Sequence, residues 1–287
     1  MEGKEFYQVN GIDLHVKDFG KETDPIIIFL HGFPEFWYGW RNQIYYFVEN
    51  GFRVIIPDLR GYNKSSKPRS IYDYKIENSM GDIVALIHQF NNHKVYLVGH
   101  DWGGVVAWHL TIEYPDLFYK MVAINIPHPK VALSFLITNP MQMLRSWYIG
   151  FFQLPLIPEF LCSLFNFKIF KNTMLNTSLK GTFSKEDLKK YEQAWKQPGA
   201  IKAMINWYRG YKYSKLDRNK KSNIPIHIIW GKRDNFLSHK MATLSLKFCM
   251  AGSLKFIEEG THWVHIEKPK VVNETILQFF KATEAIK

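Results

Sequence analysis

Asp101 stands at the centre of a glycine-rich segment, Gly99 to Gly104, that could hold a nucleophile. Glycines two residues before and two residues after a central residue are typical of a nucleophile elbow, a strand–turn–helix too tight for side chains at those positions. Serine is the usual central residue, whereas a carboxylate is already ionised at neutral pH and needs no base to attack. Attack on an acyl group would give only an anhydride. We therefore expect Asp101 to attack a saturated carbon that carries a leaving group.

Two later residues could complete such a reaction. The ester formed on Asp101 is released only when a general base, oriented by an acid, activates water. Asp234 follows an apolar run that ends at Trp230, and His262 follows another that ends near Ile257. We expect His262 to be the base and Asp234 to orient it. The order nucleophile, acid, histidine is that of the α/β-hydrolases.

Alternating strands and helices would bring these residues together. Apolar runs typical of buried strands recur along the chain, at residues 25–30, 53–56, 95–98, 121–126, 226–230 and 254–257. Helical patterns alternate with them, at residues 40–49, 76–90, 240–250 and 269–281. Residues 6–9 and 12–16 flank Asn10-Gly11, which predicts a hairpin. The alternation predicts an α/β fold with a mostly parallel, doubly wound sheet that binds ligands at the carboxyl ends of its strands.

The alternation stops between Pro127 and about Asn223, where the segment is helical and rich in aromatic residues. We interpret it as an inserted helical cap. The predicted division is then a core of residues 1–127 and 223–287 and a cap of residues 128–222. The most apolar stretch, residues 147–170, contains prolines and charged residues, which argues against a transmembrane helix and leaves interfacial contact open.

Composition limits the class of protein. The 287 residues suit one α/β domain with an insertion, and the net charge of +11 comes mostly from lysine, with much of it at residues 180–196 and 212–221. We interpret this charge as a solvated surface; weak attraction to anionic membranes or acidic ligands is the alternative, and no motif indicates nucleic-acid binding. Cys162 and Cys249 lack metal-binding spacing and are expected to be reduced thiols. Residues 1–15 lack the apolar core of a signal peptide, so we expect a cytoplasmic protein, with export by an unrecognised route left open.

Taken in order, the strand-end motifs resemble those of the epoxide hydrolase family of α/β-hydrolases. The resemblance runs nearly end to end, and the ordered set is far more specific than any single motif. The motifs are His31-Gly32-Phe33-Pro34-Glu35 with Trp40-Arg41, Asp58-Leu59-Arg60-Gly61-Tyr62, Gly99 to Gly104, Asn125-Ile126-Pro127-His128-Pro129, Trp230 to Asp234, and His262-Trp263.

The resemblance implies further roles. It assigns the oxyanion hole for ester hydrolysis to the backbone N–H groups of Phe33 and Trp102. It places two tyrosines of the cap, Tyr148 and Tyr208, where they would hold and protonate the oxygen of the opening epoxide. It implies no cofactor and no metal. Should the cap alignment slip, the nearest substitutes are Tyr191, Tyr211 and Tyr213.

We expect four other histidines to have structural roles. We expect His31 to shape its loop and not to act as a second base, and we expect His100, His109 and His128 to be packing or turn residues. Two departures from the family pattern, Asn63-Lys64 and Thr261, leave the catalytic groups in place but bear on the shape of the substrate near that rim.

The sequence therefore predicts an epoxide hydrolase that converts a lipophilic epoxide and water to a vicinal diol through an ester of Asp101. A haloalkane or haloacid dehalogenase on the same scaffold is the alternative, since such enzymes also use an aspartate nucleophile. A ligand-binding protein on a retired hydrolase scaffold is a third interpretation, which the joint presence of Asp101, Asp234 and His262 disfavours. The physiological substrate, the regiochemistry and the oligomeric state stay open.

Overall fold

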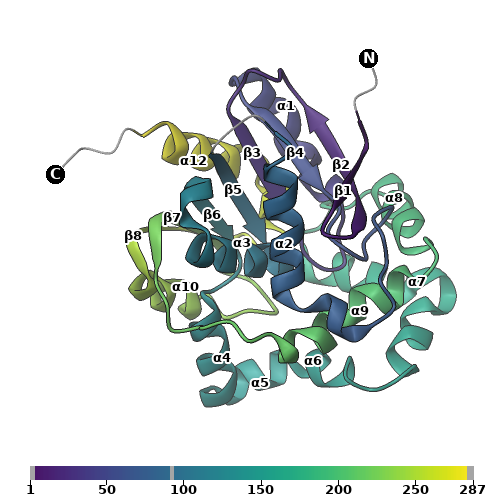
Figure 1. Cartoon of the computed structure of the whole chain (residues 1–287). Helices are drawn as coiled ribbons and strands as arrows, with labels where there is room; N and C mark the ends of the chain where they lie inside the picture. The colour runs from purple at the N-terminus through teal and green to yellow at the C-terminus, as the bar shows by residue number, and fades with distance from the viewer. Residues whose placement is uncertain (1–3, 91–93, 283–287) are drawn as a thin grey trace.

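The computed structural model describes residues 4–90 and 94–282. At its centre is an eight-stranded sheet with the order β1-β2-β4-β3-β5-β6-β7-β8 (Figure 1). Its strands are β1 (Phe6–Val9), β2 (Ile12–Phe19), β3 (Ile26–Leu30), β4 (Arg53–Pro57), β5 (Val95–His100), β6 (Phe118–Ile124), β7 (Ser222–Gly231) and β8 (Cys249–Ile257). Only the β1–β2 and β2–β4 pairs are antiparallel. The predicted fold class is confirmed.

Helices cover both faces of the sheet, and the central strand β3 is accordingly apolar and buried at every position. In β3, Ile27 and Phe29 join one core cluster and Ile26, Ile28 and Leu30 join the other, so alternate side chains enter opposite faces. The Ile27 face packs against α1 and α12, and the Ile26 face against α2 and α3. The helices of the core are α1 (Arg41–Glu49), α2 (Ile76–Ile87), α3 (Asp101–Glu113), α10 (Lys240–Ser245), α11 (Val264–Glu267) and α12 (Pro269–Lys281).

Local sequence determined the ends of some elements and not of others. Asn10 and Gly11 both have positive φ, as the predicted hairpin requires. The prediction of one helix over residues 240–250 is wrong at its end. α10 ends at Ser245, a 3-10 helix covers Leu246–Phe248, and β8 begins at Cys249. β8 is an edge strand with many exposed positions, so the apolar run at residues 254–257 marked only its partly buried end.

Six helices lie between β6 and β7 in the chain, and we call them the cap helices. They are α4 (Pro129–Thr138), α5 (Pro140–Arg145), α6 (Trp147–Phe151), α7 (Ile157–Thr177), α8 (Lys185–Trp195) and α9 (Ala200–Gly210). Figure 1 shows them along the lower and right side of the molecule. A helical insertion at this point agrees with the prediction. The exact division into core and cap stays a prediction: β7 already begins at Ser222, and residues 1–3 and 283–287 of the predicted core lie outside the described residues.

Short 3-10 helices connect larger elements at Trp37–Trp40, Ile71–Tyr74, Pro115–Leu117 and Tyr211–Tyr213. In the described part of the chain, the search for a helix with the length and apolar character needed to cross a lipid bilayer finds no candidate.

Candidate active site

Asp101 lies at the junction of β5 and α3 with a φ of +48°, in the predicted strand–turn–helix. The flanking glycines have a steric reason. A Cβ on Gly99 would lie 2.7 Å from the carbonyl oxygen of Gly103, and a Cβ on Gly103 would lie 2.3 Å from the carbonyl oxygen of Leu30. Only hydrogen fits at these positions, and the sharp turn aims the Asp101 carboxylate out of the sheet edge.

His262 lies between the two aspartates. Its Nδ1 is 2.9 Å from Oδ2 of Asp234, and its Nε2 is 3.6 Å from Oδ2 of Asp101. Asp234 follows β7 and His262 follows β8, as predicted, and both are buried. Because β6, β7 and β8 are adjacent and parallel, their carboxyl ends bring the loops to one edge.

Both oxygens of the Asp234 carboxylate accept hydrogen bonds. Its Oδ1 accepts hydrogen bonds from the backbone N–H groups of Phe236 and Leu237, at 2.7 and 3.0 Å. Its Oδ2 accepts one from Nδ2 of Asn125 at 2.7 Å, in addition to its contact with His262. These bonds fix the orientation of the carboxylate and so the orientation of the imidazole.

Asn125 is a functional residue that sequence reasoning missed. It has a φ of +47° just after β6, its Nδ2 reaches both Asp234 and the carbonyl oxygen of Thr261, and its Oδ1 accepts from the N–H of Gly231. It therefore ties together the loops that carry the acid and the histidine. The feature of the sequence that could have identified it is an asparagine at the end of a buried strand, inside a motif to which no role was assigned.

The two predicted oxyanion donors flank Asp101. The backbone N–H of Phe33 donates to Oδ1 of Asp101 at 2.8 Å. Trp102 follows Asp101 in the first turn of α3, where a backbone N–H has no partner within the helix. Phe33 is thus seen in contact with the carboxylate, and Trp102 is placed beside it.

Tyr148 of α6 and Tyr208 of α9 line the same cavity as Asp101 and His262. Their rings lie 5.9 Å apart, and the ring of Tyr208 also meets those of Phe33 and Trp102 edge to face, at 5.2 and 5.0 Å. The substitutes Tyr191, Tyr211 and Tyr213 are not among the lining residues. The structure therefore brings together all seven residues predicted for the site, while their roles stay predictions.

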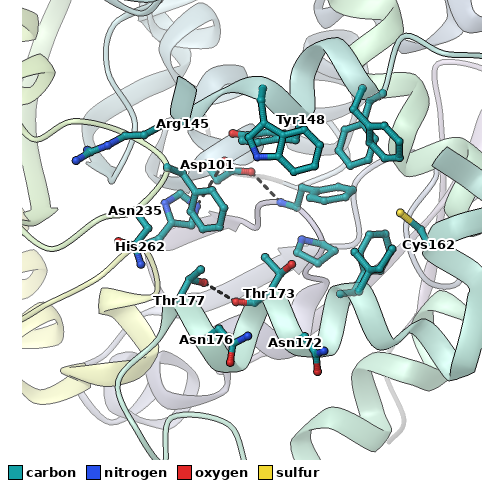
Figure 2. Close-up of a pocket in the computed structure, with 18 of the residues that line it drawn as sticks. Asp101, Arg145, Tyr148, Cys162, Asn172, Thr173, Asn176, Thr177, Asn235 and His262 are labelled. Atoms are coloured by element: carbon teal, nitrogen blue, oxygen red, sulfur yellow. Dashed lines mark hydrogen bonds and ion pairs between the residues drawn. The ribbon is translucent and has the colours of Figure 1, made fainter. Parts of the chain in front are cut away.

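The cavity has a volume of about 620 Å³ and lies between the strand-end loops and the cap helices. Figure 2 shows Tyr148 and Asp101 on one side and Thr173 and Thr177 of α7 on the other. Aromatic side chains are the largest group in the wall: Phe33, Trp147, Tyr148, Phe151, Phe152, Phe170, Tyr208, Phe236 and Trp263. Such a wall suits an apolar ligand.

Burial and neighbouring charges set the protonation states. Burial works against ionisation of Asp101, but His262, His100 and the Phe33 N–H together hold its pKa below the usual range. Burial first, and the nearby carboxylates second, raise the pKa of the Tyr148 phenol; burial also raises that of Tyr208. At neutral pH an ionised carboxylate therefore faces two protonated phenols.

The pKa of His262 is raised. Burial disfavours its imidazolium form, but the carboxylates of Asp234 and Asp101 outweigh burial and raise the pKa to about 10. Removing the charge of either aspartate would lower this pKa, which makes the basicity of His262 dependent on the state of Asp101.

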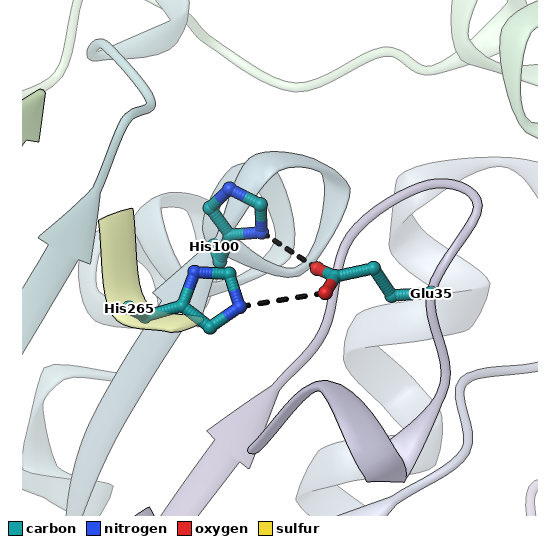
Figure 3. Close-up of side chains that lie close together, drawn as sticks. All are labelled: Glu35, His100 and His265. Atoms are coloured by element: carbon teal, nitrogen blue, oxygen red, sulfur yellow. Dashed lines mark hydrogen bonds and ion pairs between the residues drawn. The ribbon is translucent and has the colours of Figure 1, made fainter. Parts of the chain in front are cut away.

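Behind His262 lies a buried cluster of Glu35, His100 and His265 (Figure 3). The two nitrogens of His100 lie 2.9 Å from Oε2 of Glu35 and 2.9 Å from the carbonyl oxygen of His262. Burial acts against the charge of Glu35, yet the two histidines hold its pKa well below the usual range. The carboxylate of Glu35 and the carbonyl oxygen of His262 are both acceptors, so the ring of His100 is held between the two.

Three such residues could ligate a metal ion, but here the donor atoms are engaged with one another. Both nitrogens of His100 lie at hydrogen-bond distance from acceptors, and Oε1 of Glu35 lies 3.4 Å from Nε2 of His265. The cluster is a hydrogen-bonded group that links Glu35 to the backbone of His262 through His100. His100 therefore does more than the predicted packing or turn role, because it links the loop of Glu35 to that of His262.

The remaining histidines make local contacts. Nε2 of His31 accepts from the N–H of Leu59 at 3.0 Å, and its Nδ1 lies 3.0 Å from the carbonyl oxygen of Gly32, so it shapes its loop as expected. Nδ1 of His128 accepts from the N–H of Lys130 at the start of α4, and His109 is buried within α3.

Comparisons with known proteins bear on the fold and the family. The profile of the alpha/beta hydrolase fold family matches residues 25–269. The chain is 45% identical to the AB hydrolase superfamily protein YfhM of Bacillus subtilis (strain 168), over 96% of this chain and 97% of that protein. It is 35% identical to epoxide hydrolase 4 of Mus musculus, over 95% of this chain and 77% of that protein. The crystal structure of a variant of a Bacillus megaterium epoxide hydrolase superposes with a TM-score of 0.87 at 30% identity, over 96% of this chain and 100% of the other.

Proposed function

Because the chain belongs to the epoxide hydrolase family of the α/β-hydrolases, we propose that it converts a lipophilic epoxide to a vicinal diol through an ester of Asp101. The family predicted from the ordered motifs is confirmed by these matches, and the protein is a hydrolase. The single observation that carries the proposal is the meeting of an ionised Asp101 and two protonated phenols in one apolar cavity.

In the first step a carboxylate oxygen of Asp101 attacks an epoxide carbon from the side opposite the ring oxygen. The carbon–oxygen bond of the ring breaks, and its electron pair stays on the oxygen. Tyr148 and Tyr208 hydrogen-bond this oxygen, and one of them gives it a proton. The products are an ester of Asp101, an adjacent hydroxyl group and a phenolate.

Ester formation also prepares the base for the second step. Once Asp101 is esterified, its negative charge no longer raises the pKa of His262. His262 then gives up its extra proton, which restores the phenol through direct or water-mediated transfer. The neutral imidazole, still oriented by Asp234, is ready to accept a proton from water.

In the second step this water attacks the ester carbonyl carbon of Asp101 while His262 takes its proton. The resulting oxyanion lies near the N–H groups of Phe33 and Trp102, each of which supplies about 2.7–4 kcal/mol if it acts as oxyanion-hole donors do elsewhere. The intermediate then releases the alkoxide of the product, which takes the proton from His262. The carboxyl group left on Asp101 gives its proton to His262, so the diol leaves and both the carboxylate and the imidazolium are restored.

The substrate class follows from the wall of the cavity. Its aromatic lining favours an epoxide with an apolar substituent. A structure of the similar Bacillus megaterium enzyme contains its product, a naphthyloxy-propane-1,2-diol, and this supports a bulky aromatic or aliphatic group for the present chain.

The deciding experiment uses His262→Gln with an aryl or fatty-acid epoxide. Ring opening should proceed and ester hydrolysis should stall, so intact mass spectrometry should show one substrate added to the protein and peptide mapping should place it on Asp101. Asp101→Asn, the matched control, should acquire no adduct. Halide release from a haloalkane by the wild type, together with no diol formation from any epoxide, would point instead to the dehalogenase.

A further inference from the structure

The cap helices expose an unusual amount of apolar surface. More than half of the large apolar side chains that are exposed in the described residues lie between Leu133 and Leu175. They are Leu133, Ile137, Met141, Met143, Leu144, Trp147, Leu154, Leu156, Ile157, Phe160, Phe165, Ile169 and Leu175, and we call them the cap surface. Large exposed apolar patches on a protein mark places where it contacts another apolar body.

Two members of the cap surface are presented on strained backbone. Leu156 and Phe165 have φ values of +63° and +49°, and their exposed fractions, 75% and 80%, are the highest among the exposed large apolar residues. Phe165 lies in a bend inside α7, where residues 164–167 leave helical geometry. A left-handed conformation and an apolar side chain in water are both unfavourable. The described residues leave both side chains exposed, which points to a partner outside the chain.

The cap surface borders the mouth of the cavity that contains Asp101. Leu144, Trp147 and Ile169 both line the cavity and belong to the cap surface. A body that covers the cap surface would therefore also face the entrance of the cavity.

The charged residues around the cap surface indicate the kind of partner that would bind it. Between residues 129 and 177 the basic residues are Lys130, Arg145, Lys168 and Lys171, of which Lys171 pairs with Glu192 of α8; the single acidic residue, Glu159, pairs with Arg209. The chain as a whole has a net charge of +11. Two copies of such a face would repel each other, whereas anionic lipid attracts it, and basic side chains around an apolar patch suit a headgroup region.

We propose that the cap surface docks on anionic lipid bilayers, with Leu156 and Phe165 inserted among the lipids and the cavity mouth turned toward the acyl chains. A lipophilic ligand could then enter the cavity from the bilayer. The docking stands on its own; only this supply of substrate rests on the function proposed above.

Vesicle co-sedimentation of the full chain tests the docking. Vesicles of phosphatidylcholine alone are compared with vesicles that also contain phosphatidylglycerol, at low and at physiological salt. We expect binding to the anionic vesicles that weakens as salt rises. The double variant Leu156→Gln/Phe165→Gln should lower the partition coefficient about tenfold or more.

The matched control removes two exposed tyrosines far from the cap, Tyr45→Gln/Tyr119→Gln. Tyr45 lies in α1 and Tyr119 near the start of β6, at the sheet edge opposite the cavity. This control should change the partition less than about twofold. Equal losses in both variants, or no binding to anionic vesicles at low salt, would overturn the proposal.

A second measurement separates the membrane from a second copy of the chain. Light scattering after gel filtration should give the same oligomeric state for the wild type and the Leu156→Gln/Phe165→Gln variant. Conversion of a dimer to a monomer by these substitutions would make the cap surface an interface between copies and would reject the membrane. Loss of epoxide turnover in the wild type would reject the proposed function and leave the docking result standing.

Discussion

At the level of single residues, the proposed chemistry depends on an ionised carboxylate and two protonated phenols in the same cavity. Asp101 is ionised because donors surround its carboxylate, while burial keeps the phenols of Tyr148 and Tyr208 protonated. A nucleophile and two acids can therefore act on one substrate at neutral pH without titrating each other.

We expect Tyr148→Phe and Tyr208→Phe each to slow ring opening about tenfold or more, because each removes one of two partly redundant acids, and the double variant to lose about 10³-fold or more. The rate is measured as adduct formation in a His262→Gln background. Tyr213→Phe, which removes a phenol outside the lining of the cavity, is the control and should react at the parent rate. A double variant that opens epoxides at the parent rate would refute the acid role.

The buried contact between Glu35 and His100 supports a second prediction at this scale. Glu35→Gln removes the carboxylate that lies 2.9 Å from Nδ1 of His100, which we expect to lower the free energy of unfolding by about 1–3 kcal/mol. Glu258→Gln is the control, since Glu258 pairs with Lys232 on the surface and such pairs contribute less than about 1 kcal/mol. Urea denaturation measures both. Equal, small losses would mean that the buried carboxylate of Glu35 contributes no more to stability than a surface one.

At the level of elements, the junction of β5 and α3 depends on close backbone approach. Gly103→Ala would place a methyl group 2.3 Å from the carbonyl oxygen of Leu30, so β3 and α3 would have to separate. We expect a loss of at least about 2 kcal/mol in the free energy of unfolding, measured by urea denaturation.

Gly150→Ala is the matched control for this substitution. No atom lies within 4 Å of the added Cβ, and Gly150 is inside α6, where alanine favours the helix by up to about 1 kcal/mol. It should therefore be neutral or mildly stabilising. An equally tolerated Gly103→Ala would show that the elbow is looser than its geometry indicates.

At the level of the whole molecule, His262 links stability to pH. Although burial disfavours its charge, Asp234 and Asp101 raise its pKa to about 10, against 6.5 in the unfolded chain. Between these values the folded protein holds a proton that the unfolded chain has lost, so this residue stabilises most below pH 6.5 and its contribution fades as the pH rises to about 10. The slope is up to about 1.4 kcal/mol per pH unit.

His262→Gln removes this contribution. We expect the free energy of unfolding to fall more steeply between pH 7 and pH 9 for the wild type than for the variant, as measured by urea denaturation at each pH. Burial lowers the pKa of His109 to about 3 and that of His265 to about 4, so these residues act below this window. Parallel slopes in the two proteins would mean that His262 is neutral in the folded state.

The sheet, the elbow and the order of Asp101, Asp234 and His262 could be predicted from the sequence, because each depends on local signals. Apolar runs marked the inner strands, paired glycines marked the tight turn, and parallel strands place the loops that follow them at one edge. Edge strand β8 was only partly found, since its exposed positions lack an apolar pattern.

The groups that hold these residues in place, and the surface that the cap exposes, became visible only in three dimensions. Asn125 reaches Asp234 across 109 residues of chain, and Glu35 reaches His100 across 65. Such bonds depend on strand order and loop packing, which no local pattern encodes. The aromatic content of the cap was visible in the sequence, but its division between a cavity wall and an exposed cap surface required knowing which face of each helix is covered.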